Sequence, residues 1–287
     1  MRGRKHFLRP HCLPGRAYAQ PGTRYTNGCP TARIPPVSDP PLAYDVGMNN
    51  GDDSAYYLAK GCRVVAIEAD PELCAAAGDR FAAPIAEGRL RILNIGVGPA
   101  PGCLTFYRHA HSVLSTFVPP AQRVGHAALL REAAFQTLPI EVRRLSDVVT
   151  AHGPPHYIKI DVEGFDTACL NDLNLHGIRP AYISAEAHTL ETFCHLVVMG
   201  YRDFKMVAGQ TVAEDFACHR IRTNDGAFRD FAFQLHSAGP FGEDIPGDWL
   251  DADAIVRRWL ARGDGWFDLH ARAVPGGVPQ DGLSAPR

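Results

Sequence analysis

Short apolar runs alternate with helical patterns through the middle of this 287-residue chain, and that alternation limits the fold more than any other feature. Runs typical of β-strands occur at residues 42–46, 63–68 and 89–94, and helical patterns at 52–60 and 70–83 separate them. Nearly unbroken apolar strands joined through helices are typical of a parallel sheet with helices on both faces. We therefore expect an α/β fold with a doubly wound, mostly parallel sheet.

The same alternation continues toward the C-terminus. Further strands are expected at residues 103–107, 138–145, 157–161, 181–186, 202–207 and 230–236, and further helices at 165–176, 189–199 and 250–262. One domain with appendages accounts for this pattern, because α/β domains often reach about 250 residues. We place that domain at residues 41–270. Residues 1–40, rich in Pro and Gly, and the tail at 271–287 offer too little apolar surface to offset their ordering entropy, so we expect both to be disordered.

Composition excludes several classes of protein. Apolar residues make up 46% of the chain and charged residues 21%, which suffices for a large core. The net charge of −2 provides no basic field to attract a polyanion, so we expect no nucleic-acid partner. No apolar run reaches the roughly 18 residues that would span a membrane. The eight cysteines are scattered without a C-x-x-C pair, which favours reduced packing residues of a cytoplasmic protein. Nothing in the sequence indicates an oligomeric state.

A glycine-containing segment directly follows the first expected strand. It reads Asp45-Val-Gly47-Met-Asn49-Asn-Gly51, and a helix begins after it. Ligands of open parallel sheets bind at the carboxyl ends of the strands, and glycine lets the backbone approach them closely. The G-x-x-x-G spacing lacks the G-x-G-x-x-G fingerprint of dinucleotide binding, which weighs against NAD. Asp45 could instead help to hold an ammonium group, through backbone or water. The alternative is an ordinary strand-to-helix turn.

Acidic and amide side chains stand at the ends of the next two strands. Glu68 follows Gly47 by about 20 residues, at a position where a carboxylate accepts hydrogen bonds from both ribose hydroxyls. Asp70 either lies beside the ribose or caps the helix that starts at Pro71, and we favour the cap. Asn94 ends the third strand, where its amide could bond an adenine edge or simply form a turn. The sequence therefore predicts a nucleoside site at this sheet edge.

Three strings together resemble a known family. They are Tyr44-Asp-Val-Gly-Met-Asn-Asn-Gly51, Val65-Ala-Ile-Glu-Ala-Asp-Pro71 and Ile158-Lys-Ile-Asp-Val-Glu-Gly164. They resemble the FkbM family of class I S-adenosylmethionine-dependent methyltransferases over roughly residues 42–210, and the third string is the most specific. The resemblance implies a Rossmann-like fold with a seven-strand sheet, S-adenosyl-L-methionine as cofactor, and O-methylation of a hydroxyl on a secondary metabolite or sugar.

Candidates for the reacting centre follow the fourth and fifth main strands. Asp161 is placed to face the transferred methyl group or the methionyl ammonium, and whether it acts as a base is open. Glu163 could form a structural ion pair with Lys159 on the same strand face. His188 is the best-placed histidine for a general base, because the unperturbed pKa of imidazole suits proton transfer near neutrality. Glu186, Asp161 and Glu163 could also hold Mg²⁺, but their spacing does not require it, and we expect no metal.

Other patterns are less specific. His109 and His111 share one strand face but have no further zinc ligands beside them. The loop at residues 112–117 could cover the cofactor or be plain surface. The Gly- and Pro-rich residues 239–245 could form a lid, a wall of the acceptor site or a simple turn.

The sequence as a whole predicts an S-adenosylmethionine-dependent methyltransferase whose partner is a small-molecule or carbohydrate acceptor. The cofactor-binding residues that we expect are Asp45, Gly47, Asn49, Gly51, Glu68, Asn94 and Asp161, and the catalytic residues are Asp161 and His188. Two alternatives remain: a non-catalytic cofactor-binding regulatory protein and, with less support, an NAD-dependent oxidoreductase. Fold resemblance alone does not separate them, because function depends on the site.

Overall fold

A computed structural model describes residues 39–122, 134–262 and 265–273 of the chain. Nearly all of the expected N-terminal extension, and the tail after Ala273, lie outside the described residues. The last described strand ends at Arg272 and so passes the domain boundary that we expected at residue 270.

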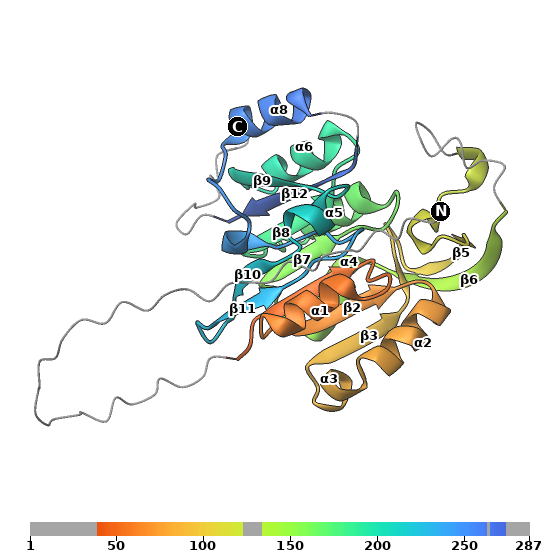
Figure 1. The fold of residues 1–287 in the computed structure, drawn as a ribbon. Coiled ribbons are helices and arrows are strands. Elements are labelled where there is room, and N and C mark those ends of the chain that lie inside the picture. The colour runs from red at the N-terminus through yellow and green to blue at the C-terminus, as the bar shows by residue number, and fades with distance from the viewer. Residues whose placement is uncertain (1–38, 123–133, 263–264, 274–287) are drawn as a thin grey trace, which may run out of the picture. The chain divides into compact units, whose positions relative to one another are not determined.

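Seven strands form the central sheet (Figure 1). They are β1 (Leu42–Val46), β2 (Arg63–Glu68), β3 (Leu90–Asn94), β7 (Tyr157–Ile160), β8 (Tyr182–Glu186), β9 (Asp203–Ala208) and β12 (Phe267–Arg272). Their order is β3-β2-β1-β7-β8-β12-β9, and β12 runs antiparallel to both of its neighbours. The chain moves outward from β1 to β3 and then returns beside β1 as β7. The strand order therefore reverses between β1 and β7, where ligands of such sheets bind.

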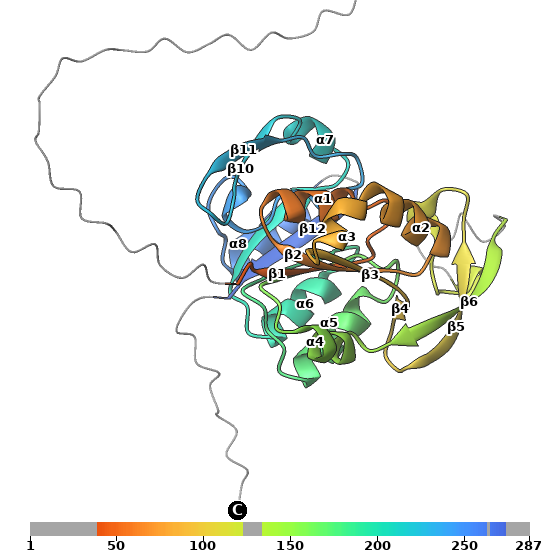
Figure 2. The ribbon, with the colours of Figure 1, turned by 90° about the horizontal axis from the view of Figure 1, so that it is seen from below.

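Helices cover both faces of the sheet, as expected (Figure 2). On one side lie α1 (Asp52–Ala59), α2 (Pro71–Arg80) and α3 (Ala82–Ala86), and on the other lie α4 (Leu145–His152), α5 (Asp166–Leu175) and α6 (Leu190–Val198). A further helix, α8 (Ala252–Ala261), packs beside β9 through Ile255 and Trp259. Asp70 caps α2 by accepting a hydrogen bond from the amide of Glu72 at 2.9 Å, which confirms the predicted helix start.

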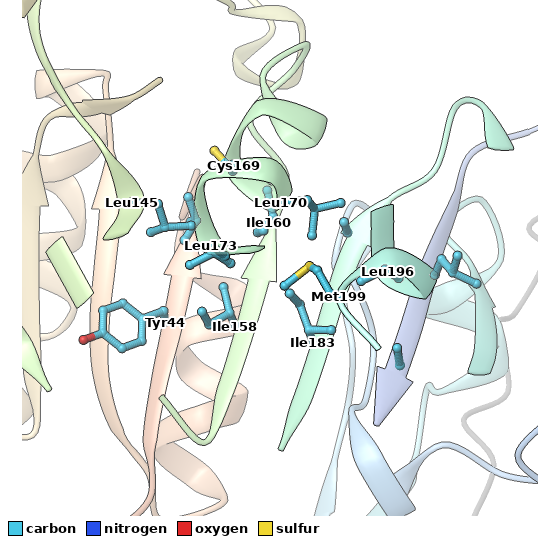
Figure 3. Packing of buried hydrophobic residues seen from close by; sticks show 14 of the residues in the cluster. Tyr44, Leu145, Ile158, Ile160, Cys169, Leu170, Leu173, Ile183, Leu196 and Met199 are labelled. Carbon is cyan, nitrogen blue, oxygen red and sulfur yellow. The ribbon is translucent and has the colours of Figure 1, made fainter. Parts of the chain in front are cut away.

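The two-residue period of the strands divides the core into two layers. Tyr44, Ile158 and Ile183 point to the α5 side, where they meet Leu173 and Met199 (Figure 3). Each side chain buried in this way contributes about 1.5–3 kcal/mol of transfer free energy. The alternate residues of the same strands face α1, and several of them are polar. This second face carries the groups with which the site is built.

An antiparallel hairpin leaves the sheet after β3. It consists of β5 (Gly102–Arg108) and β6 (Gln136–Arg143), and the short β4 (Gly96–Val97) pairs with β6. Two single-turn 3₁₀ helices, η1 (Ser112–Leu114) and η2 (Pro120–Gln122), follow β5. The strands expected at residues 103–107 and 138–145 are therefore present as β5 and β6, and the structure shows that they pair with each other.

The segment between β9 and β12 differs from the prediction. It contains α7 (Val212–Asp215), β10 (His219–Arg222), β11 (Phe228–Phe231) and the 3₁₀ helix η4 (Gly242–Asp244). We expected a strand of the central sheet at residues 230–236, and this prediction is wrong. The strand found there, β11, ends at Phe231 and pairs with β10 alone. The seventh sheet strand is β12, where Asp268 and His270 interrupt the apolar pattern that would have revealed it.

Six cysteines lie in the described part of the chain, and none of them is in a disulfide: Cys62, Cys74, Cys103, Cys169, Cys194 and Cys218. Cys62 and Cys169 are buried packing residues, as predicted, whereas Cys103, Cys194 and Cys218 are exposed. Of the described helices, none has the length and apolar character needed to cross a membrane.

Candidate active site

The loop after β1 adopts three left-handed conformations in close succession. Gly47, Asn49 and Gly51 have φ angles of 84°, 50° and 82°. A Cβ on Gly47 would lie 1.8 Å from the carbonyl oxygen of Asp161, and one on Gly51 would lie 2.6 Å from the Phe81 ring. Both glycines are therefore required by contacts within the protein, not only by the approach of a ligand that the sequence suggested.

Glu68 closes this loop onto the end of β2. Its side chain is buried, with 8% exposed, and its two oxygens accept hydrogen bonds from the amides of Asn49 at 2.7 Å and Asp70 at 2.8 Å. Burial raises the pKa of the carboxyl. A carboxylate has about four acceptor positions, and the two amides occupy two of them.

The hairpin is tied to the same edge. Arg108 of β5 contacts Asp70 at 2.8 Å and also pairs with Glu72. Asn94, at the end of β3, donates from its amide nitrogen to the carbonyls of Glu68 and Ala69, both at 3.0 Å. The amide nitrogen of Asn94 is therefore already hydrogen-bonded to the end of β2. The adenine contact that we predicted would have to be made by the amide oxygen.

Lys159 of β7 is a buried centre of charge that the sequence analysis did not assign to the site. Its ammonium donates to the carbonyl of Gly47 at 2.8 Å and lies 3.3 Å from Asp161, 3.6 Å from Asp45 and 3.6 Å from Asp53. Although burial opposes the charge, these three carboxylates raise the pKa of Lys159 well above its ordinary value. One cation therefore fixes the glycine loop and three acids together.

The members of this group differ in their access to a ligand. Asp45 is fully buried, its Oδ2 accepts a hydrogen bond from Ser54 at 2.6 Å, and burial raises its pKa to about 6. Asp161 keeps 31% of its side chain exposed. In the described part of the chain, the ion pairs of Lys159 run to aspartates and not to Glu163, the partner that we had considered.

Glu163 lies instead with Glu186 and His188. Atoms of these three side chains lie within 4.8 Å of one another, and His188 Nε2 is 2.9 Å from Glu186 Oε2. The Glu186 carboxylate raises the pKa of His188 to about 9, and burial together with Glu186 raises that of Glu163 to about 9. His188 is therefore protonated at neutral pH. We had assigned it as a base because an unperturbed imidazole is largely neutral at that pH, and this condition is not met here.

Asp166 shapes the turn that carries Glu163. Its carboxylate accepts hydrogen bonds from the amides of Val162 at 3.1 Å and Gly164 at 3.2 Å, and Glu163 between them has a φ of 50°. Thr116 donates to the carbonyl of Glu163. The loop at residues 112–117 thus reaches the end of β7.

Residues 237–245 pack into the core between α1 and the sheet. Asp53 of α1 accepts hydrogen bonds from Ser237 and the amide of Ala238, and the Phe241 ring stacks on Tyr157 at 4.0 Å. Phe241 is 2% exposed. A lid or a simple turn does not fit a segment that is buried and anchored in this way.

Two cavities open near these groups. The smaller, of about 100 Å³, is lined by Gly164, Asp166, Thr167, Glu186, His188, Thr189 and Thr192. The larger, of about 340 Å³, is lined by Asp52, Ala55, Arg80, Phe231, Ala232, Phe233, Gln234 and Ser237. His109 and His111 belong to no cluster of three or more possible metal ligands among the described residues.

Sequence reasoning missed Lys159, Asp53 and Asp166 as parts of the site. A lysine inside an apolar strand was the available signal, because a buried ammonium must be paired with acids. No such signal marked Asp53 or Asp166, since acids in the first turn of a helix are ordinary.

The architecture defines a class of protein. A doubly wound seven-strand sheet with one antiparallel strand, a glycine loop after β1 and an acid at the end of β2 has the Rossmann-like fold of class I methyltransferases. The chain belongs to the FkbM methyltransferase family, since the model described as "Methyltransferase FkbM domain" matches residues 45–208, more than half of its length.

Solved structures with a similar fold include two methyltransferases. The methyltransferase FkbM from Methylobacillus flagellatus KT has 17% identity and a TM-score of 0.39, and the match covers 59% of this chain and 40% of that one. The precorrin-6y C5,15-methyltransferase from Geobacter metallireducens GS-15 has 11% identity and a TM-score of 0.36, with 83% of each chain covered. No curated protein sequence matches the chain. We base no functional assignment on these two structural likenesses.

Proposed function

We propose that this protein transfers a methyl group from S-adenosyl-L-methionine to a hydroxyl of a small molecule or carbohydrate. The observation that carries the proposal is the buried Glu68 carboxylate, which closes the glycine loop onto the end of β2, where it would accept hydrogen bonds from ribose hydroxyls. Membership of the FkbM family supports it.

The residues that we assign to the cofactor site are Asp45, Gly47, Asn49, Gly51, Glu68, Asn94 and Asp161. The site fits a nucleoside in a further respect, because Asn49 Oδ1 is buried and has no partner within the described residues. Such an atom is costly unless a donor reaches it. Asp45, fully buried, acts as a positioning residue by holding Lys159 and, through it, the carbonyl of Gly47.

When bound, the cofactor supplies an electrophilic methyl group on a sulfonium. Asp161 is the most accessible of the carboxylates held by Lys159, and it would hold the methionyl ammonium or accept the proton of the acceptor hydroxyl. His188 carries a proton at neutral pH, so it would orient the acceptor through a hydrogen bond unless that proton is lost. The main contribution of the chain is then to hold the acceptor in line with the methyl group.

Thermal unfolding with added ligand tests the cofactor. S-adenosylmethionine at about 100 times its dissociation constant stabilises the folded state by about 2.7 kcal/mol, which corresponds to a rise in Tm of about 5–10 °C for a domain of this size. Glu68→Ala should abolish the rise. The matched control is Glu87→Ala, because Glu87 is exposed and pairs only with Arg89 among the described residues, so its loss should leave the rise intact.

Each other outcome favours a different function. No rise with S-adenosylmethionine would refute the proposal, and a rise with NAD instead would favour the oxidoreductase alternative. Binding of S-adenosylmethionine without transfer of a labelled methyl group to any component of the producing cell's extract would favour the non-catalytic alternative.

A further inference from the structure

Three potential metal ligands converge at the ends of β7 and β8. Glu163 belongs to the turn between β7 and α5, and Glu186 and His188 belong to the end of β8 and the turn after it. Their oxygen and nitrogen atoms lie within 4.8 Å of one another, and no other group of three such residues is found within residues 39–122, 134–262 and 265–273.

The Glu186 carboxylate provides an independent observation. The residue is 9% exposed, and its Oε2 is buried without an aligned hydrogen-bond donor, although His188 Nε2 lies 2.9 Å away. The partner of this oxygen is therefore the proton on His188, and when His188 gives up that proton to act as a ligand, a bound cation would take the proton's place. Two ligands at right angles, each about 2.1 Å from a metal ion, are separated by about 3.0 Å. The distance between Glu186 and His188 therefore suits adjacent positions around one ion.

Charge around the group also favours a cation. Asp161 and Asp166 act electrostatically on both glutamates and add to the negative charge there. Lys159 is the nearby buried cation, but it is already shared among Asp161, Asp45 and Asp53. The cavity of about 100 Å³ beside Glu186 and His188 leaves room for an ion with water or a ligand oxygen in its remaining positions.

We propose that Glu163, Glu186 and His188 bind one divalent ion of a first-row transition metal. One imidazole with two carboxylates suits Mn²⁺, Fe²⁺, Co²⁺ or Zn²⁺, whereas Mg²⁺ and Ca²⁺ prefer oxygen ligands alone. From the sequence we considered Mg²⁺ held by Glu186, Asp161 and Glu163, and we expected no metal because their spacing does not require one. In the structure Asp161 pairs with Lys159, and His188 takes its place. This inference goes beyond the proposed methyl transfer and does not depend on it. A bound ion would displace the proton of His188, so in the metal-bound protein the ligand role replaces the acceptor contact proposed for that proton.

Mn²⁺ binding to the full chain, after treatment with a chelator, tests the site. Titration followed by electron paramagnetic resonance should show one tightly bound ion per chain, and spin-echo modulation should show one coordinated imidazole nitrogen. Glu163→Gln and His188→Asn should each weaken binding by roughly tenfold or more, and His188→Asn should also remove the nitrogen modulation. His188 is more than half exposed, so its replacement should leave the fold intact, which a melting curve verifies.

A second His–Glu pair supplies the control. His195 and Glu191 lie 3.8 Å apart on α6, without a third ligand among the described residues. Glu191→Gln and His195→Asn should leave Mn²⁺ binding unchanged. The proposal is overturned if the wild-type chain takes up neither Mn²⁺ nor Zn²⁺ stoichiometrically, or if the variants at 163 and 188 bind as the wild type does. Binding of Mg²⁺ as tight as that of Mn²⁺ would overturn the assignment to a transition metal.

Discussion

Gly47 lies where the backbone of the first loop passes the backbone of Asp161, directly after β7. Its φ is 84°, and a Cβ at this position would lie 1.8 Å from the carbonyl oxygen of Asp161. Both facts exclude a side chain. The same residue gives its own carbonyl to Lys159. One position therefore sets the shape of the loop and links it to the buried charges.

Gly47→Ala should lower the free energy of unfolding by at least about 2 kcal/mol, because an alanine in the left-handed region costs roughly 1–2 kcal/mol before any collision is counted. Gly78→Ala is the matched control. Gly78 lies inside α2 with nothing within 4 Å of a built Cβ, so alanine there should stabilise the chain by roughly 0.5–1 kcal/mol. Urea unfolding measures both changes, and equal effects at the two glycines would contradict this account.

The segment at residues 237–245 acts as a structural element without regular secondary structure. Lys205 of β9 donates to the carbonyl of Ile245 at 2.6 Å, and Tyr56 of α1 donates to Asp244 at 2.8 Å. Phe241, which precedes both anchors, is stacked on Tyr157. The segment thus covers the α1 face of the sheet where β7, β8 and β12 carry polar residues.

Phe241→Ala should cost about 3–5 kcal/mol of unfolding free energy, because a large ring is removed from a closed site and leaves a cavity. The comparison is Phe228→Ala in β11, where the ring is 56% exposed and the expected change is within about 0.5 kcal/mol. Denaturant titration separates the two. A small loss at residue 241 would show that the segment is held by its hydrogen bonds alone.

The whole sheet depends on its last strand. β12 fills the space between β8 and β9 and pairs with both, so Asp268 lies opposite Glu186 and His270 lies opposite Ser184 and Lys205. Without it, β8 and β9 would each expose an unpaired edge, and an unpaired apolar edge promotes aggregation.

A chain ending at Arg262, which lacks β12, should therefore fail to unfold cooperatively and should aggregate. A chain ending at Ala273 keeps all seven strands and should unfold in one transition. Circular dichroism melts and size-exclusion chromatography of the two chains provide the measurement. Cooperative unfolding of the shorter chain would mean that β9 can pair directly with β8.

Local sequence determined the strands from β1 to β3, the helices between them, the cap at Asp70 and the loop from Asp45 to Gly51. These features depend on periodicity, capping and the preference of glycine for left-handed backbone, which act between residues close in the chain. The contacts that exclude a side chain at Gly47 and Gly51 come instead from Asp161 and Phe81. The placement of Glu68 at a strand end also followed from the sequence, because it required only that β2 end there.

Only the tertiary structure decided the pairing of β12, the burial of residues 237–245 and the partners of the charged groups. Lys159 meets Asp45 and Asp53 across more than a hundred residues, and His188 joins Glu163 because two parallel strands end side by side. Such contacts depend on strand order and register, which local patterns do not encode, since a shift of one residue turns every side chain to the opposite face.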